Sequence, residues 1–161
     1  MAIIMFKSIL VICTGNICRS PFGEHVLHRL LPTLKIDSAG VSALVNHEAD
    51  PTAVKIASKF GISLEGHKGK QFTPLMGRDY DLLLVMDKAH LEQVCKISPE
   101  VRGKTMLLGH WLGSREIADP YRKSDEAFEL IFELIEQSCS LWAKKVNELI
   151  LGITNDIIAK Q

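Results

Sequence analysis

Two short apolar runs constrain the fold of this chain more than any other feature of its sequence. Residues 8–12 read SILVI and residues 80–86 read YDLLLVM, so each run has four or five apolar side chains in succession. A strand that is apolar on both faces is typical of a parallel sheet covered by helices on either side. Each run is also followed by a segment with helical signals, and such βα units predict an α/β protein.

Strand and helix signals alternate along the rest of the chain. Further strands are expected at residues 34–38 and 105–108, and helices at residues 20–31, 51–60, 88–96 and from residue 124 onward. The last helix carries apolar residues at helical spacing from Phe128 to Leu149. This order predicts three layers, with a four-stranded parallel sheet between helices on both faces. At 161 residues and without a linker-like segment, the chain is expected to form one domain.

Composition excludes several classes of function. Lys plus Arg and Asp plus Glu number 19 each, so net charge gives no reason to expect nucleic acid or an anionic membrane as partner. No run reaches the length of a membrane span, and the apolar N-terminus lacks the basic region and cleavage site of a signal peptide. The four cysteines are too few and too unevenly spaced for a disulfide framework or a metal cage. We expect a cytoplasmic protein that needs no metal or other cofactor.

The candidate site is the loop after the first strand, residues 13–20, which reads CTGNICRS. Parallel sheets bind ligands beyond the carboxyl ends of their strands, and the N-terminus of the following helix favours an anion. Gly15 permits backbone geometry that other residues resist, and Asn16 tolerates the left-handed conformation. Together these features predict a nest of main-chain N–H groups that fits a phosphate. Ser20 and Pro21 are expected to be the N-cap and the first residue of the next helix.

Two side chains of this loop are candidates for the chemistry. The planar guanidinium of Arg19 can bind two phosphate oxygens at once. A helix N-terminus and a nearby cation favour a thiolate, so Cys13 is a candidate nucleophile, and Ser20 is placed to hydrogen-bond its sulfur. The alternative is that Cys13 is an inert core residue and Ser20 only a helix cap. The combination of loop, glycine, arginine and helix start favours the phosphate site.

At this point a resemblance to a known family is plain. Residues 13–21, CTGNICRSP, are similar to the phosphate loop of the low-molecular-weight protein tyrosine phosphatases. Matching segments stand at residues 37–40 (DSAG) and 119–121 (DPY). Residues 40–44 and 109–111 most resemble the bacterial members encoded with capsule or exopolysaccharide export systems. The resemblance implies a core of residues 7–150 and an additional tail of residues 151–161.

This resemblance implies a metal-free hydrolysis of phosphotyrosine through a phosphocysteine intermediate. Cys13 would be the nucleophile, Arg19 the phosphate clamp, and Asp119 the general acid that protonates the leaving tyrosine. Leu44 and Tyr121 would form opposite walls around the substrate ring. The implied substrate and phosphate contacts are Thr14, Gly15, Asn16, Ile17, Cys18, Ser20, Leu44 and Tyr121.

Two further residues have supporting roles in the resemblance. Cys18 is expected to trap oxidised Cys13 as a reversible disulfide. His67 is expected to buttress the phosphate loop, which is a structural role.

Three alternatives remain open at this stage. A phosphoarginine phosphatase resembles this loop but has Thr where Ile17 stands here, and an apolar side chain suits a phenyl ring better. An arsenate reductase needs a close cysteine pair, which Cys95 and Cys139 do not provide in the sequence. A phosphate-binding or thiol-redox module that has lost turnover has no support in the sequence, because every residue that turnover requires is present.

The partners follow from the resemblance as well. We expect a phosphotyrosine protein as substrate, specifically a tyrosine autokinase that controls polysaccharide export. Nucleic acid binding and membrane insertion are not expected, and the protein is expected to be a monomer.

Overall fold

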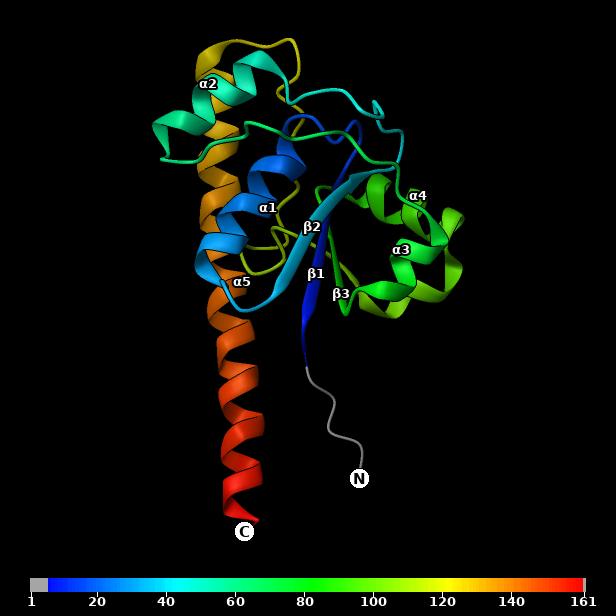
Figure 1. Cartoon of the computed structure of the whole chain (residues 1–161), viewed down its shortest axis with the longest axis vertical. Coiled ribbons are helices and arrows are strands. Elements are labelled where there is room, and N and C mark those ends of the chain that lie inside the picture. Colours follow the sequence, from blue (N-terminus) through cyan, green and yellow to red (C-terminus); the bar gives the residue numbers. More distant parts are fainter. Residues whose placement is uncertain (1–5, 161) are drawn as a thin grey trace.

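A computed structural model describes residues 6–160, without the side chains of residues 153–157. Its strands form one sheet in the order β2-β1-β3-β4, and every neighbouring pair is parallel (Figure 1). The strands are β1 (Ser8–Cys13), β2 (Lys35–Gly40), β3 (Leu82–Val85) and β4 (Thr105–Leu107). The four-stranded parallel sheet expected from the sequence is confirmed.

The two apolar runs form the two central strands of this sheet. All residues of β1 and β3 are buried. Because successive side chains of a strand point to opposite faces, Ile9 and Val11 pack in one core cluster while Leu10 and Ile12 pack in the other. At the edge of the sheet, β2 instead leaves Lys35 exposed. Burial on both faces therefore explains why the central strands carry the strongest sequence signal.

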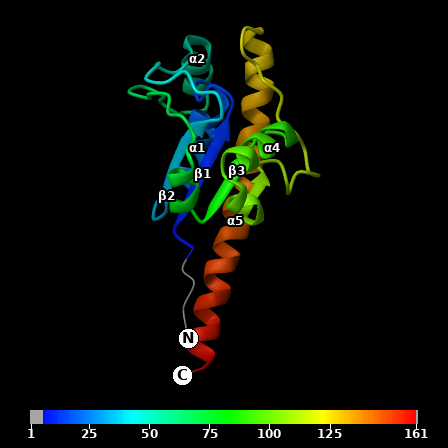
Figure 2. The same cartoon turned by 90° about the vertical axis from the view of Figure 1, so that its right-hand side faces the viewer.

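Helices cover both faces of the sheet, as predicted. They are α1 (Arg19–Leu30), α2 (Pro51–Lys59), α3 (Pro74–Asp79), α4 (Lys88–Ile97) and α5 (Asp125–Ala159), with a 3-10 helix, η1 (Pro99–Lys104). On one face lie α1 and α5, with α2 against the start of α5, and on the other lie α3, α4 and η1 (Figures 1 and 2). The elements α3 and η1 were not predicted, because six residues are too few to show a helical period.

The last helix is longer than the sheet on which it packs. The apolar face predicted for it is buried from Phe128 to Val146, but Leu149 is 50 % exposed because α5 continues past the end of the sheet (Figure 1). The expected tail thus belongs mostly to α5, and its Leu151 is also exposed. In the described part of the chain, no helix combines the length and the apolar character that a membrane crossing requires.

Candidate active site

The phosphate loop between β1 and α1 is fixed in place by hydrogen bonds that its backbone carbonyl groups accept. Hydrogen bonds of 2.6–3.0 Å link its successive carbonyls to groups outside the loop. From Cys13 to Ile17, the donors are the backbone N–H groups of Val41, Ser42 and Leu44, the His67 ring and the N–H of Asp50. Within the described chain, the backbone N–H groups of residues 14–18 have no such partner. With the carbonyls turned away, these donors are left for a bound anion, as a phosphate nest requires.

The expected left-handed residue in the loop is Asn16, with φ of 59°. Its buried side chain donates to the Ser20 and Ser38 hydroxyls at 2.8 and 2.9 Å, and accepts the Lys70 N–H at 2.9 Å. Gly15 was expected to adopt a backbone geometry that other residues resist. This expectation was wrong, because the φ of Gly15 lies outside the left-handed region. A β-carbon at Gly15 would instead contact the Leu44 side chain at 3.9 Å, and so would narrow the binding pocket.

The helix start also differs from the prediction. The N-cap of α1 is Cys18, without a side-chain cap, and Arg19 is the first helical residue. Ser20 therefore lies inside the first turn, where its hydroxyl is 2.9 Å from the Cys13 sulfur. Asn16 donates to the same hydroxyl oxygen, and the Ser20 proton has two acceptors within reach, the Cys13 sulfur and the more distant carbonyl of Ala39 at 3.5 Å. This geometry suits a thiolate, which accepts but cannot donate.

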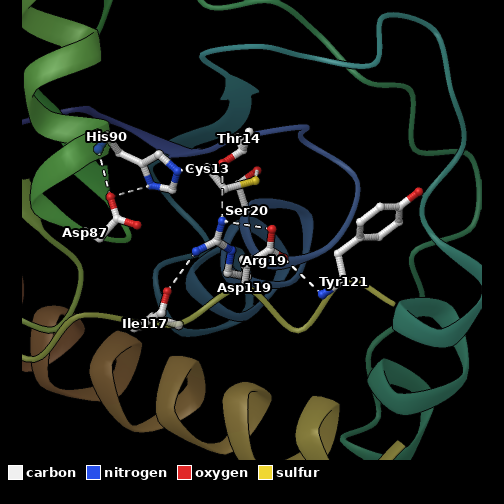
Figure 3. Close-up of polar contacts among 9 residues, drawn as sticks. All are labelled: Cys13, Thr14, Arg19, Ser20, Asp87, His90, Ile117, Asp119 and Tyr121. Atoms are coloured by element: carbon white, nitrogen blue, oxygen red, sulfur yellow. Dashed lines mark hydrogen bonds and ion pairs between the residues drawn. The ribbon is translucent and has the colours of Figure 1, made fainter. Parts of the chain in front are cut away.

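The Arg19 side chain is buried and anchored at both ends of its guanidinium (Figure 3). Nη1 donates to the carbonyl of Ile117 at 2.7 Å, and Nη2 donates to Thr14 Oγ1 at 3.4 Å. Nη2 also lies 3.8 Å from a carboxylate oxygen of Asp119. Arg19 thus joins the phosphate loop to the segment that carries the predicted general acid.

Asp119 and Tyr121 lie across from the phosphate loop. The Asp119 carboxyl accepts the backbone N–H of Tyr121 at 3.0 Å, and about half of its side chain is open to solvent. Tyr121 is 40 % exposed and Leu44 39 % exposed. A solvent-accessible carboxyl next to a partly exposed aromatic ring can reach a substrate that enters from outside.

These residues enclose a pocket of ≈ 220 Å³. It is lined by Cys13, Thr14, Gly15, Ile17, Cys18, Arg19, Ser42, Leu44, Asp119 and Tyr121. The structure therefore brings all predicted site residues together except Asn16 and Ser20, which lie behind the loop and support it. The pocket lies beyond the carboxyl end of β1, where α/β sheets bind their ligands.

The two loop cysteines have different surroundings. Both are free and both line the pocket. Burial, followed by the negative charge of Asp50, raises the pKa of the Cys18 thiol far above its usual range. Cys18 is therefore a neutral thiol, whereas the Cys13 sulfur lies 2.9 Å from the Ser20 hydroxyl, a group that can donate to it. This difference favours Cys13 as the nucleophile.

His67 contacts the loop in the way expected of a buttress. Its Nε2 atom is 2.6 Å from the carbonyl oxygen of Asn16. A carbonyl only accepts, so Nε2 carries the proton. Burial lowers the pKa of His67, which keeps the ring in the neutral form.

Sequence reasoning missed three residues around the site. Ser42 lines the pocket, while His90 and its neighbour Asp87 contact the loop through Thr14. The position of Asp87 held a usable signal, because it directly follows the strongest predicted strand. Residues at that point lie at the same edge of a parallel sheet as Cys13.

The remaining cysteines lie away from the pocket. Cys95 is on α4 and Cys139 on α5, which cover opposite faces of the sheet, and both are buried. Neither lines the pocket. They cannot relay a disulfide to Cys13, as an arsenate reductase would require.

A tetrahedral anion in this loop would touch the Cys13 sulfur, with Arg19 beside it and Asp119 on the far side of the pocket. A cysteine, an arginine and a carboxyl group placed in this way can transfer a phosphoryl group to sulfur and then to water. The fold and the site thus fit a phosphatase, with Cys13 as the candidate nucleophile.

Comparisons with known proteins narrow this class. The family described as low molecular weight phosphotyrosine protein phosphatase matches residues 8–150. The chain is 54 % identical over 147 residues to the low molecular weight protein-tyrosine-phosphatase Etp of Escherichia coli strain K12, covering 91 % of this chain and 99 % of that protein. The crystal structure of the tyrosine phosphatase Wzb from Escherichia coli K30 with sulphate has a TM-score of 0.86 and 62 % identity, covering 88 % of this chain and 99 % of Wzb.

A more distant solved structure bears on substrate choice. The YwlE arginine phosphatase from Geobacillus stearothermophilus has a TM-score of 0.84 but 28 % identity, covering 91 % of this chain and 96 % of that one. The sequence identity to the tyrosine phosphatases is thus much higher, over a similar length of chain. This chain belongs to the low molecular weight phosphotyrosine protein phosphatase family.

Proposed function

We propose that this protein hydrolyses phosphotyrosine in proteins, with Cys13 as the nucleophile that forms a phosphocysteine intermediate. The observation that carries the proposal is the position of the Cys13 sulfur, which is 2.9 Å from the Ser20 hydroxyl and faces the same pocket as Arg19 and Asp119. The nest supplies main-chain donors for the phosphate oxygens, and Arg19 supplies a positive charge. Together they stabilise the charge that develops on the transferred group.

In the first step, the thiolate of Cys13 attacks phosphorus and the bond from phosphorus to the tyrosine oxygen breaks. A phenolate is basic, so its departure needs a proton donor. Asp119 lies across the pocket from the loop and, in its carboxylic acid form, gives its proton to the leaving oxygen. The tyrosine leaves as a neutral hydroxyl, and the phosphoryl group remains on sulfur.

In the second step, water attacks the phosphocysteine and Asp119, now a carboxylate, takes the proton of that water. The sulfur–phosphorus bond breaks and Cys13 leaves as a thiolate. The Ser20 hydroxyl, oriented by Asn16, stabilises this leaving sulfur with a hydrogen bond. The same pair of residues thus supports sulfur as a nucleophile in one step and as a leaving group in the other.

The walls of the pocket favour a phenyl ring over a guanidinium. Ile17, Leu44 and Tyr121 present apolar or aromatic surface around the opening. A phenyl ring gains from contact with such surface, whereas a guanidinium would lose hydrogen bonds to water that these walls do not replace. The higher identity to tyrosine phosphatases supports the same choice.

Substrate choice is tested with two peptides of equal sequence, one carrying phosphotyrosine and the other phosphoarginine. We expect the wild-type enzyme to have the higher kcat/KM on the phosphotyrosine peptide. Cys13→Ser should hydrolyse neither peptide. Ile17→Thr is the matched variant, because it replaces one apolar wall with a smaller polar side chain, and it should reduce the preference for phosphotyrosine. A wild-type enzyme that prefers phosphoarginine would contradict the proposal.

We propose that the physiological substrate is a tyrosine autokinase that controls polysaccharide export. We also propose that the enzyme is a monomer and acts in the cytoplasm. The support is the similarity to Wzb and Etp. A pull-down with Cys13→Ser, which binds substrate without turning it over, should capture a tyrosine-phosphorylated kinase from the source cells. Arg19→Ala, which lacks the phosphate clamp, is the control that should capture none. Capture of unrelated phosphoproteins alone would contradict this assignment.

A further inference from the structure

His90 lies beside the phosphate loop and has no part in the proposed reaction. It is in the first turn of α4 and 3 % exposed. Its Nε2 atom is 2.7 Å from Thr14 Oγ1, and its Nδ1 atom is 3.5 Å from Oδ1 of Asp87 (Figure 3). Asp87 is fixed as the N-cap of α4, because the same oxygen accepts the backbone N–H of His90 at 2.8 Å. A continuous row of polar groups therefore runs from Asp87 to the phosphate loop.

The direction of the hydrogen bonds in this row follows from the groups available. Arg19 only donates, so Thr14 Oγ1 is the acceptor in its contact with Nη2. The Thr14 hydroxyl has one proton, and His90 Nε2 is positioned to accept it. Thr14 is exposed at the pocket, so the tautomer of His90 decides which group donates in this contact. With Nε2 unprotonated, Thr14 donates to it and keeps a lone pair of Oγ1 for Arg19.

Asp87 favours the same arrangement from the other side of the ring. A neutral histidine has one ring proton, and with Nε2 unprotonated that proton is on Nδ1. Nδ1 is buried and makes no hydrogen bond within the described residues, so its main compensation is the attraction to the Asp87 carboxylate. The opposite tautomer would place a lone pair against this negative oxygen. Burial, and then the charge of Arg19, lower the pKa of His90 and keep the ring neutral.

We propose that His90, as the Nδ1–H tautomer, is a positioning residue that orients Arg19 through the hydroxyl of Thr14. The inference rests on the role proposed above for Arg19 as the phosphate clamp. One end of the guanidinium is fixed by Ile117, and the Thr14 oxygen gives the second point that sets its plane. Without His90, the Thr14 hydroxyl would rotate freely and its lone pair would not stay directed at Arg19.

The tautomer can be measured without reference to activity. Nitrogen–proton correlation NMR of the histidine rings at neutral pH distinguishes Nδ1–H from Nε2–H, and His90→Gln identifies the His90 signals among the six histidines. We expect Nδ1–H in the wild-type protein. An Nε2–H ring or an imidazolium would overturn the inference. Because this result does not depend on turnover, it separates failure of this inference from failure of the proposed function.

A matched pair of variants tests the consequence for Arg19. His90→Phe keeps a ring of similar size but removes the acceptor, whereas His90→Gln places a carbonyl oxygen near the position of Nε2. For His90→Phe, we expect kcat/KM on a phosphotyrosine peptide and the affinity for inorganic phosphate each to fall about tenfold, the effect of one lost hydrogen bond to a charged group. His90→Gln should restore most of both.

The opposite order would overturn the proposal, because a ring that only fills space would be replaced well by Phe and poorly by Gln. Asp87→Asn gives an independent measurement if His90→Phe does not fold. Asparagine retains the N-cap acceptor but removes the charge, so we expect the Nδ1–H tautomer to lose its preference. An unchanged tautomer in Asp87→Asn would contradict the role of the carboxylate.

Discussion

Replacing Asn16 by alanine is expected to lower both stability and activity, by amounts that the loop geometry sets. The side chain makes three hydrogen bonds, of which those to Ser20 and Ser38 are buried and that from the Lys70 N–H is partly buried. Each is worth about 1 kcal/mol, and alanine at a φ of 59° adds about 1 kcal/mol of left-handed strain. We therefore expect the free energy of unfolding to fall by about 4 kcal/mol, which is large for a single substitution.

The same substitution should reduce turnover, because it leaves the Ser20 hydroxyl without the donor that orients it toward Cys13. A weakened hydrogen bond to a charged sulfur corresponds to a loss of about tenfold to hundredfold in rate. Urea unfolding and kcat for p-nitrophenyl phosphate measure the two effects. Asn16→Gly is the control, because glycine has no left-handed strain but does not restore the hydrogen bonds of asparagine. Compared with Asn16→Ala, it should regain about 1 kcal/mol of stability and little activity. A fully active Asn16→Gly would refute the reasoning.

Four other predictions follow from the site and the fold. Asp119→Asn should slow the hydrolysis of phenyl phosphate more than that of p-nitrophenyl phosphate, since the better leaving group needs less protonation; equal losses would remove Asp119 from the acid role. Cys18→Ser should prevent recovery by dithiothreitol after mild peroxide treatment; unchanged recovery would exclude the protective disulfide. Deleting residues 151–161 should leave kcat/KM and the unfolding midpoint nearly unchanged, because this stretch lies outside the family match at 8–150; a large loss would show a structural role for the tail. His67 has a pKa below its ordinary 6.5, so the unfolded chain binds more protons and stability should fall as pH drops below about 6.5; urea unfolding of His67→Gln should show a weaker fall, and equal slopes would contradict this.

The sequence predicted the fold well because the strongest signals come from burial on both faces of the sheet. The apolar runs at β1 and β3 indicated strands covered on both faces, and the alternation with helices indicated a parallel sheet; the strand order came only from the structure. The weakest point was the start of α1. The Ser20-Pro21 pair is typical of a helix start, but here the hydroxyl of Ser20 contacts the sulfur of Cys13 and the helix begins two residues earlier.

The site residues that belong to a local sequence motif were predicted. Residues that reach the site only through tertiary packing were missed. Cys13 and Arg19 belong to one continuous loop, so their spacing is visible in the sequence. The contact of His90 with Thr14 joins residues 76 positions apart, and no local pattern indicates it. Glycine roles are equally hidden: a β-carbon at Gly40 would lie 2.4 Å from the Thr14 carbonyl oxygen, a close approach that only the folded chain shows.

The most direct test of the proposed chemistry is the chemical identity of the phosphorylated intermediate. The enzyme is mixed with a phosphotyrosine peptide, quenched within a turnover, digested and analysed by mass spectrometry. The proposed mechanism predicts one phosphoryl group on the peptide that contains Cys13, attached to that sulfur and absent in Cys13→Ser. A phosphoryl group on Cys18 or on a histidine, or turnover that persists in Cys13→Ser, would contradict it.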